Sequence, residues 1–233
     1  MATKGVFITG SGTAVGKTYV SALLLKGFSE LGHKTTYMKP VETGCEDAPL
    51  SDKTPVGVDT LYALKFASCK TDFNLHSPYR FSPACSPHLA ARIDGSEIKV
   101  ENIVLTYGNL NKNTAANIVL VEGAGGLLVP VNDKEYITDV IKALGIPVIL
   151  VVTPGLGTLN HTFLSLRVLE QYKIPVAGIV INNAQNIKRN FIYEDNVNTI
   201  RLRTSPIPCL NTDYNAQADN KLTEFCDEVI ARL

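Results

Sequence analysis

Short runs of apolar residues alternate along this chain with longer stretches in which apolar positions recur every three or four residues. Uninterrupted Val, Ile and Leu runs are typical of strands that are buried on both faces. Such runs predict strands at residues 6–9, 35–38, 117–121, 148–152 and 176–181. Helical spacing predicts helices near residues 17–31, 59–68, 99–116, 135–144, 158–172 and 187–200, followed by a closing helix at 219–233.

This alternation favours an α/β fold with a doubly wound, mostly parallel sheet and helices on both faces. A length of 233 residues suits a single domain spanning 1–233. Segments 40–58 and 76–88 are rich in Pro, Gly and polar residues, and we expect them to be substrate-binding loops. Ligands bind such sheets outside the carboxyl ends of the strands, so polar residues that follow a strand are the first candidates for a site.

The most informative candidate is the segment GSGTAVGKT at residues 10–18, called the P-loop below, between the first predicted strand and the first predicted helix. Small residues let backbone N–H groups close around phosphate oxygens, and the helix N-terminus adds a partial positive charge. Lys17 is placed to reach the β- and γ-phosphates of a nucleotide, and the Thr18 hydroxyl to bind Mg²⁺. Five residues separate Gly10 from Gly16, one more than is usual, which leaves an ordinary glycine-rich turn as the alternative.

Two charged residues follow later strands and point to the same edge of the sheet. Lys39 comes directly after the second predicted strand, although a lysine there can also be a plain surface residue. Glu122 ends the third predicted strand and is followed by a Gly-Ala-Gly-Gly turn. A carboxylate at the tip of a buried strand is costly unless it is paired or binds a metal ion, and in P-loop proteins such a residue holds Mg²⁺.

Several other polar residues have a structural reading beside a functional one. Asp59 begins a helical stretch and by itself is best read as a helix N-cap, with Asp47 and Asp52 as competing carboxylates. His88 lacks a Ser-His-Asp spacing and is read as a loop histidine. Gly157 and Thr158 can start a helix whose free N–H groups face an anion, or form an ordinary βα turn with Thr158 as the N-cap. Asn182 ends the fifth strand, where it can read an adenine edge or simply form a turn.

Composition narrows the classes of partner. There are 22 basic and 22 acidic residues, and no polybasic block appears, so we do not expect nucleic acid to bind. Five cysteines without a Cys-x-x-Cys pair argue against a disulfide framework or a zinc site and suit a reducing cytoplasm. The first strand starts without a leader, and the apolar run at 146–153 is too short to span a membrane. We therefore expect a cytoplasmic protein with small-molecule partners.

Taken together, the motifs resemble those of the dethiobiotin synthetases, the ATP-dependent ring-closing enzymes of biotin synthesis. The matching segments follow the order of that family from the N-terminus to the last predicted strand, and the long P-loop spacing is the family's own form. They are Thr9-Gly10 with Gly16-Lys17-Thr18, Lys39-Pro40-Val41-Glu42-Thr43-Gly44, Asp59, Ser86-Pro87-His88, VEGAGG at 121–126, Leu156-Gly157 with Asn160-His161, and Asn182. The last fifty residues match loosely, chiefly through Pro206-Ile207-Pro208.

The resemblance implies a reaction, a metal and an assembly. One amine of 7,8-diaminopelargonic acid would take up CO₂ as a carbamate, ATP would phosphorylate the carbamate, and the second amine would close the ureido ring. ADP and phosphate would be released. The resemblance further implies Mg²⁺, ATP as co-substrate, and a homodimer in which the turn at 157–160 receives the substrate carboxylate from the neighbouring subunit.

The resemblance also implies roles for individual residues. The catalytic residues would be Lys17, Lys39 and Thr13, and the Mg²⁺ ligands Thr18, Asp59 and Glu122. The nucleotide would contact Gly12, Thr13, Ala14, Val15, Gly16, Lys17, Thr18, Tyr19, Glu122, Asn182, Pro206 and Pro208. The other substrate would contact Lys39, Thr43, Ser86, Pro87, Gly125, Gly157 and Asn160.

Two P-loop positions bear on the alternatives. Some family members carry an acidic residue where this chain has Ala14, so this chain can differ from them in its preference for ATP over other triphosphates. The nearest rival is a P-loop ATPase switch of the partitioning or nitrogenase-iron-protein type, which binds a protein or DNA. Such switches carry a lysine where this chain has Gly12, which argues against that reading. Amidating synthetases need a further glutaminase domain, and a non-enzymatic nucleotide-binding module leaves Lys39 without a role.

Overall fold

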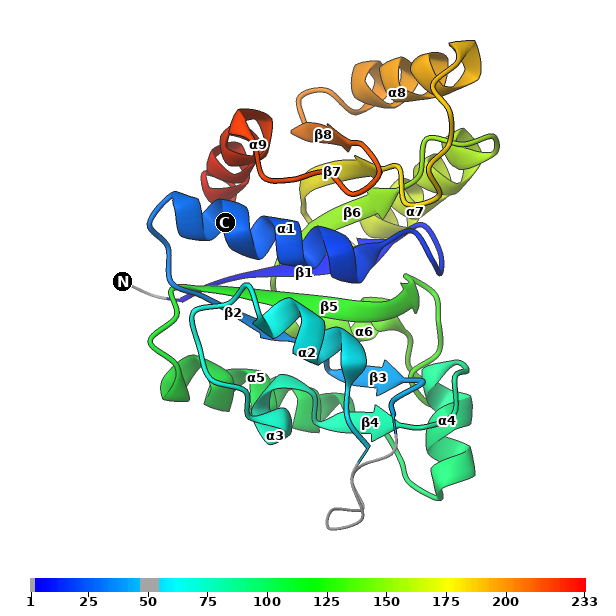
Figure 1. The fold of residues 1–233 in the computed structure, drawn as a ribbon. Coiled ribbons are helices and arrows are strands. Elements are labelled where there is room, and N and C mark those ends of the chain that lie inside the picture. The colour runs from blue at the N-terminus through cyan, green and yellow to red at the C-terminus, as the bar shows by residue number, and fades with distance from the viewer. Residues whose placement is uncertain (1–2, 47–54) are drawn as a thin grey trace.

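A computed structural model describes residues 3–46 and 55–233. Within these ranges, six strands form one parallel sheet in the order β2-β5-β1-β6-β7-β8 (Figure 1). The strands are β1 (Lys4–Gly10), β2 (Thr35–Met38), β5 (Ile118–Gly126), β6 (Val148–Val152), β7 (Val176–Asn182) and β8 (Cys209–Thr212). The predicted fold class and the five predicted strands are confirmed, and β8 is a strand that the hydrophobic pattern did not predict.

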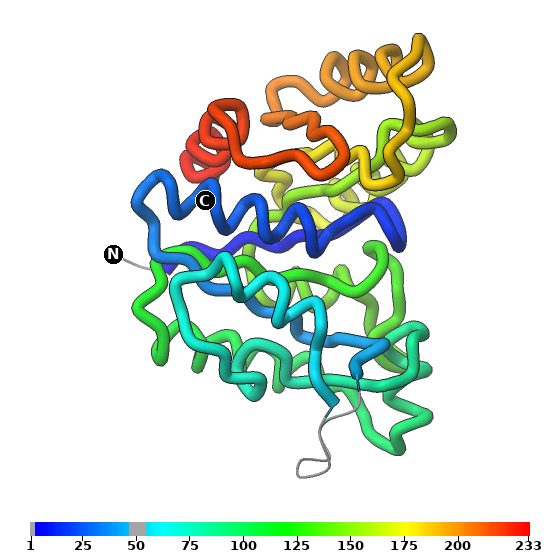
Figure 2. Tube along the Cα trace, viewed as in Figure 1, coloured from blue at the N-terminus to red at the C-terminus, as the bar shows by residue number. Residues whose placement is uncertain are grey.

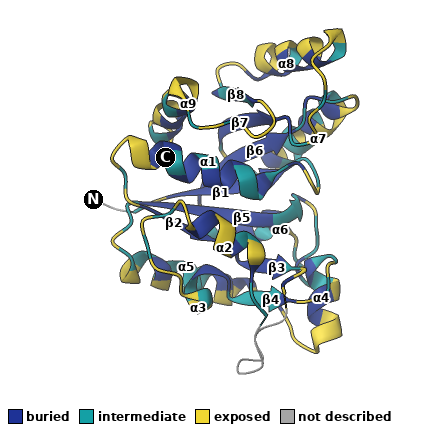
Figure 3. Ribbon diagram, in the orientation of Figure 1, coloured by how far each residue is buried: buried dark blue, intermediate teal, exposed yellow. Residues whose placement is uncertain are grey.

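Helices cover both faces of the sheet, as predicted. One face packs against α1 (Lys17–Glu30), α2 (Val58–Leu64) and α9 (Asn220–Ile230). The other packs against α5 (Val100–Asn113), α6 (Ile137–Leu144), α7 (Thr158–Gln171) and α8 (Phe191–Thr204). Alternate residues of one strand serve the two cores: in β5, Leu120 faces α1 and Val121 faces the opposite layer. Figure 3 shows the strands buried between the exposed outer surfaces of the helices.

The chain crosses the centre of the sheet in a way that opens a binding crevice. After β1 it moves to β2 on one side, returns to β5 beside β1, and then passes to β6 on the other side of β1 (Figure 2). The turns after β1, β2 and β5 therefore meet at one edge of the sheet, where neighbouring connections run in opposite directions. This edge holds the P-loop.

The two predicted loops contain more regular structure than expected. Segments 40–58 and 76–88 contribute β3 (Val41–Thr43) and β4 (Tyr79–Phe81), which pair in parallel as a separate two-stranded sheet. The short helix α3 (Phe73–His76) precedes β4, and α4 (Pro87–Asp94) follows it. Asp47 and Asp52 lie outside the described residues.

Helix ends follow local capping chemistry. The predicted helix at 187–200 instead begins at Phe191, because the Asn190 side chain accepts a hydrogen bond from the Tyr193 N–H at 3.0 Å. The closing helix α9 begins in the same way, since Asp219 accepts from the Leu222 N–H at 3.0 Å. In the described ranges, we find no helix with the length and hydropathy needed to cross a membrane.

Candidate active site

A cavity of about 300 Å³ lies at the carboxyl edge of the sheet, between the P-loop and the ends of β2, β3 and β5. Its walls bring together residues that are far apart in the sequence. They are Thr13, Ala14, Gly16, Lys17, Thr18, Lys39, Thr43, Asp59, Glu122, Gly123, Ala124 and Gly125. Most of the residues predicted for phosphate, metal and catalytic roles therefore share one cavity.

The backbone of the P-loop takes a shape that depends on its small residues. Gly16 has a φ of 85° and stands at the N-cap of α1. A Cβ at this position would lie 2.2 Å from Nδ2 of Asn182, so only glycine fits. The Asn182 amide donates to the Val15 carbonyl at 2.9 Å and accepts from the Thr212 hydroxyl at 2.9 Å. Asn182 thus ties the P-loop to the ends of β7 and β8.

Glu122 is the centre of the site. It is fully buried, and β5 continues beyond it to Gly126, so it does not end the strand as predicted. Its Oε1 accepts from the Thr18 hydroxyl at 2.8 Å and from Lys39 Nζ at 3.0 Å. Its Oε2 accepts from the Ser21 hydroxyl at 2.8 Å and the Tyr37 hydroxyl at 2.9 Å. Four donors offset the cost of burying this charge.

The two lysines of the cavity have different electrostatic surroundings. Lys39 donates to Asp59 as well as to Glu122. Burial lowers the pKa of Lys39, but the nearby Glu122 and Asp59 carboxylates outweigh it, and the net pKa is raised. Burial lowers the pKa of Lys17, whose Nζ donates to the Gly12 carbonyl at 3.0 Å. Of the two lysines, Lys17 is therefore the one with no carboxylate within hydrogen-bonding distance among the described residues.

Asp59 is the second residue of α2, so it is not the helix N-cap that the sequence suggested; Gly57 takes that position. A buried carboxylate from β3 holds the start of this helix. Oε1 of Glu42 accepts from the Asp59 N–H at 2.7 Å, and its Oε2 accepts from the Thr60 hydroxyl at 2.5 Å. The Ser77 hydroxyl donates to the same Oε2 at 3.5 Å. Glu42 positions Asp59 in the site, a role that sequence reasoning did not assign.

The arrangement fits a magnesium ion bound together with a phosphate. Mg²⁺ is usually held by one or two carboxylates and by substrate oxygens, not by an all-protein cage. Two carboxylates, Glu122 and Asp59, approach Lys39 beside the Thr18 hydroxyl. In the described part of the chain, we find no cluster of three or more His, Cys, Asp or Glu side chains that could hold a metal alone.

Some predicted residues lie elsewhere in the structure. Ser86 and Pro87 form the start of α4, and Gly157 and Asn160 form the start of α7, which follows β6. None of these four lines the cavity, and neither does His88, which lies in the first turn of α4.

The expectation for Pro206 and Pro208 needs correction. Both precede β8, whose first residue Cys209 pairs with Ile179, so they lie at the amino edge of the sheet. The P-loop follows β1 at the opposite edge, because all six strands run in parallel. The residues that do reach the P-loop side follow β8. Thr212 is bonded to Asn182, and the Tyr19 hydroxyl donates to the Ala216 carbonyl.

The structure resembles solved P-loop proteins in its fold. The structure of pnob8 ParA has a TM-score of 0.56 at 14% sequence identity, with 99% of this chain and 98% of that chain covered. The chloroplast FtsY of Physcomitrella patens has a TM-score of 0.54 at 16% identity and covers 98% of this chain and 65% of that chain. At these identities the likeness shows the fold alone.

Sequence comparison is more specific. A family model described as an AAA domain matches residues 4–211. The chain is 36% identical over 213 residues to the ATP-dependent dethiobiotin synthetase BioD of Thermodesulfovibrio yellowstonii, with 88% of this chain and 86% of the relative covered. It is 38% identical over 200 residues to the enzyme of the same name from Nitrosospira multiformis, with 86% and 84% covered. The chain therefore belongs to the family of ATP-dependent dethiobiotin synthetases.

Proposed function

We propose that this protein converts 7,8-diaminopelargonic acid, CO₂ and ATP into dethiobiotin, ADP and phosphate in a Mg²⁺-dependent reaction. Family membership supports an ATP-dependent synthetase of biotin synthesis. The observation that carries the finer assignment is the meeting of Lys17, Lys39 and two carboxylates in one P-loop cavity. A site of this kind can hold two anions side by side, which the reaction requires.

The reaction needs charge neutralisation more than a protein nucleophile. One substrate amine adds to CO₂ and loses a proton, which gives a carbamate. A carbamate oxygen attacks the γ-phosphorus of ATP and ADP leaves, so that a mixed anhydride forms. The second amine then attacks the carbonyl carbon, and phosphate leaves as the ring closes. Carbamate and triphosphate repel each other, so cationic groups and backbone N–H donors that align them supply much of the rate.

Each lysine has a part in this scheme. Lys17 is desolvated and donates to a loop carbonyl, so a triphosphate would give it the anionic partner it lacks. Lys39 is held between Glu122 and Asp59, which fixes its ammonium group at the carbamate side of the cavity. Thr13 lines the same cavity and would donate its hydroxyl to a phosphate oxygen.

The proposed metal ligands are Thr18, Asp59 and Glu122. When bound, Mg²⁺ would neutralise charge on the triphosphate and polarise its terminal phosphorus. The chain's own contribution is to keep these oxygens in place. Ser21 and Tyr37 hold Oε2 of Glu122, which leaves Oε1 directed at Thr18.

We propose that substrate binding is completed by a second copy of the chain. Thr43 and Gly125 line the cavity, and Ser86 and Pro87 would contact the substrate from α4. Gly157 and Asn160 would act across a homodimer interface. Leu156 is 90% exposed in the turn before α7, where such an interface would cover it. Mixing Lys17→Ala and Asn160→Ala subunits tests this arrangement: hybrid dimers should recover part of the lost turnover, and equal inactivity of the mixture contradicts it.

We also propose that the nucleotide base lies beside Asn182 and the segment 212–216. Ala14 replaces the acidic residue of some relatives, so ATP, CTP and GTP affinities should be compared; a strong preference for ATP refutes a relaxed specificity.

The five cysteines are free thiols, which supports a reducing cytoplasm as the location.

The deciding experiment supplies diaminopelargonate, bicarbonate, Mg²⁺ and ATP to the purified protein. Mass spectrometry should detect dethiobiotin, and omission of any one component should remove it. Phosphate release that does not depend on diaminopelargonate would instead favour the ATPase-switch reading. Lys17→Ala serves as the inactive control, and if it retains full turnover then the P-loop role is wrong.

A further inference from the structure

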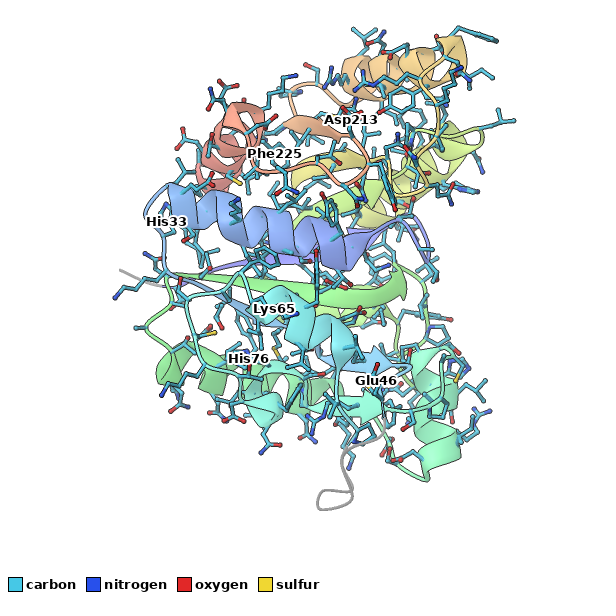
Figure 4. All side chains as sticks on the ribbon, in the orientation of Figure 1. His33, Glu46, Lys65, His76, Asp213 and Phe225 are labelled. Atoms are coloured by element: carbon cyan, nitrogen blue, oxygen red, sulfur yellow. The ribbon has the colours of Figure 1, made fainter. Side chains whose placement is uncertain are left out.

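Cys69 and His76 form a contact pair on the α3 side of the molecule, outside the cavity that holds the P-loop. Cys69 lies in the segment between α2 and α3, and His76 is the last residue of α3 (Figure 4). Sγ of Cys69 is 3.9 Å from Nε2 of His76 and 3.1 Å from the Thr36 hydroxyl. The thiol therefore has two polar neighbours that can donate to it.

The His76 ring is held between backbone carbonyls. Its Nδ1 is 2.6 Å from the Tyr37 carbonyl oxygen, and its Nε2 is 3.2 Å from the Lys70 carbonyl oxygen. A neutral imidazole carries one N–H and can donate to only one of them, whereas an imidazolium donates from both nitrogens. The ring is 1% exposed, so a charge on it requires an anion nearby. The adjacent anion that the geometry offers is a Cys69 thiolate.

The electrostatics of both groups agree with this pairing. Burial raises the pKa of Cys69, but the hydrogen bonds from His76 and Thr36 outweigh it, and the net pKa is lowered. Burial lowers the pKa of His76, but the hydrogen bonds to Cys69 and to the Tyr37 carbonyl raise it by more, so the net pKa is raised. Lys70 and Asp72 are the other charged residues that line the adjoining cavity, to which the end of α5 contributes the uncharged Asn113 and Thr114.

The thiol of this pair can be reached from outside, because Cys69 is only half-buried while the His76 ring lies beneath the surface. A cavity of about 570 Å³ opens beside it, and its walls include Cys69, Lys70 and His76. This volume is large enough for a small organic molecule. A thiolate that faces such a space can meet a reagent, unlike the buried Cys45 and Cys226.

We propose that Cys69, paired with His76, is a site of covalent modification that exchanges with low-molecular-weight disulfides. The thiolate sulfur attacks one sulfur of the disulfide, a new S–S bond to Cys69 forms, and the other sulfur leaves as a thiolate that takes up a proton from solvent. Cys69 is oxidised and the small disulfide is reduced by the same two electrons. The site is separate from the synthetase reaction and does not rest on it.

The test measures the reactivity of each cysteine in the intact protein. Purified protein is exposed to 2-hydroxyethyl disulfide across a range of pH, and mass spectrometry of peptides follows the adduct on Cys69 and on the half-buried Cys85. Cys69 should react with a pH midpoint below about 8.5, the value of an ordinary thiol. While the pKa stays above the pH, each unit by which it is lowered raises the thiolate fraction about tenfold and cuts nucleophilicity about threefold, so a net gain of about threefold over an ordinary thiol is expected for each unit.

Two variants test the origin of the effect. His76→Gln removes the imidazolium, and Thr36→Val removes the hydroxyl donor while keeping a side chain of similar size. Each should move the Cys69 midpoint upward, and Cys69→Ser should lose the adduct without loss of turnover. If His76→Gln does not fold, Thr36→Val decides. A wild-type midpoint at or above that of an ordinary thiol overturns the proposal, as does a midpoint that neither folded variant shifts.

Discussion

Replacing Tyr37 by Phe gives a direct measure of what holds Glu122 in place. The Tyr37 ring is fully buried, and its hydroxyl donates to Oε2 of Glu122 at 2.9 Å. The substitution removes one oxygen atom and one hydrogen bond to a charged acceptor, with little change in packing. A hydrogen bond to a charged group contributes about 1.5–3 kcal/mol. The Ser21 hydroxyl still donates to the same oxygen, so we expect a loss of about 2 kcal/mol in the free energy of unfolding.

Tyr193→Phe is the matched control. Tyr193 is also buried, at 1% exposure, but its hydroxyl donates to the neutral Asn211 side chain at 3.1 Å. A neutral hydrogen bond contributes about 0.5–1.5 kcal/mol, so this variant should lose about half as much stability. Burial and the adjacent carboxylates Glu122 and Glu42 raise the pKa of Tyr37 well above its usual value, so its phenol stays protonated throughout the measurement.

Urea unfolding followed by circular dichroism measures both variants. A thermal melt is the second measurement: for a chain of this size, a loss of about 2 kcal/mol corresponds to a fall in Tm of about 4–8 °C. The m value should stay constant, because neither change alters the surface exposed on unfolding. If Tyr37→Phe costs no more than Tyr193→Phe, the charge on Glu122 does not strengthen this hydrogen bond and the reasoning about the buried carboxylate is refuted.

Three further predictions concern the P-loop and Glu42, the carboxylate that holds the start of α2. Lys17→Ala should abolish turnover while leaving the unfolding midpoint in place, which parallel activity and melting measurements check. Gly16→Ala should weaken ATP binding at least tenfold in a calorimetric titration, because its φ of 85° and the 2.2 Å approach of Asn182 leave no room for a Cβ. Burial raises the pKa of Glu42, so the stability from its protonated form is fully present below about pH 4.5 and is lost as pH rises through the raised pKa. Glu42→Gln should remove this slope, and parallel slopes for variant and wild type in urea unfolding would contradict it.

The sequence predicted the central strands because both of their faces are buried. In β5 and β6, consecutive apolar residues serve the two opposite cores, and this produces the uninterrupted runs that mark a parallel sheet. The P-loop was equally predictable, since Gly16 and Lys17 occur at the junction of a strand and a helix. The motif is contiguous in the sequence and its Gly16 has the positive φ that favours glycine, so it could be recognised without tertiary information.

The missing strands lacked that signal. β8 lies at the edge of the sheet and has only four residues, of which the last two, Asn211 and Thr212, are polar, so it contains no apolar run. β3 and β4 are three residues long and lie beside prolines that read as loop signals. Missing β8 also explains the misplacement of Pro206 and Pro208: without a strand after them, nothing in the sequence showed that they precede it.

Glu42 was hidden for a different reason. Its function depends on Asp59, Thr60 and Ser77, which reach it only after the chain has folded. The sequence reflects this packing at one position: residue 57 is glycine, and a Cβ there would lie 2.3 Å from the Glu42 carboxylate. A glycine two residues before a candidate metal ligand is therefore compatible with close packing there, although the sequence alone does not name the partner.

Glu122 explains why stability and chemistry are joined in this site. Its four hydrogen-bond donors come from α1 and from the strand and turn of β2, so one carboxylate fixes the helix that follows the P-loop and the segment that carries Lys39. Burying it is favourable only while those donors are present. The same constraint orients the groups before any substrate arrives, which reduces the reorganisation that charge transfer would otherwise require. Asp59 is bound less tightly into the fold, with 45% of its side chain exposed, so it can turn toward a ligand while Glu122 keeps the frame.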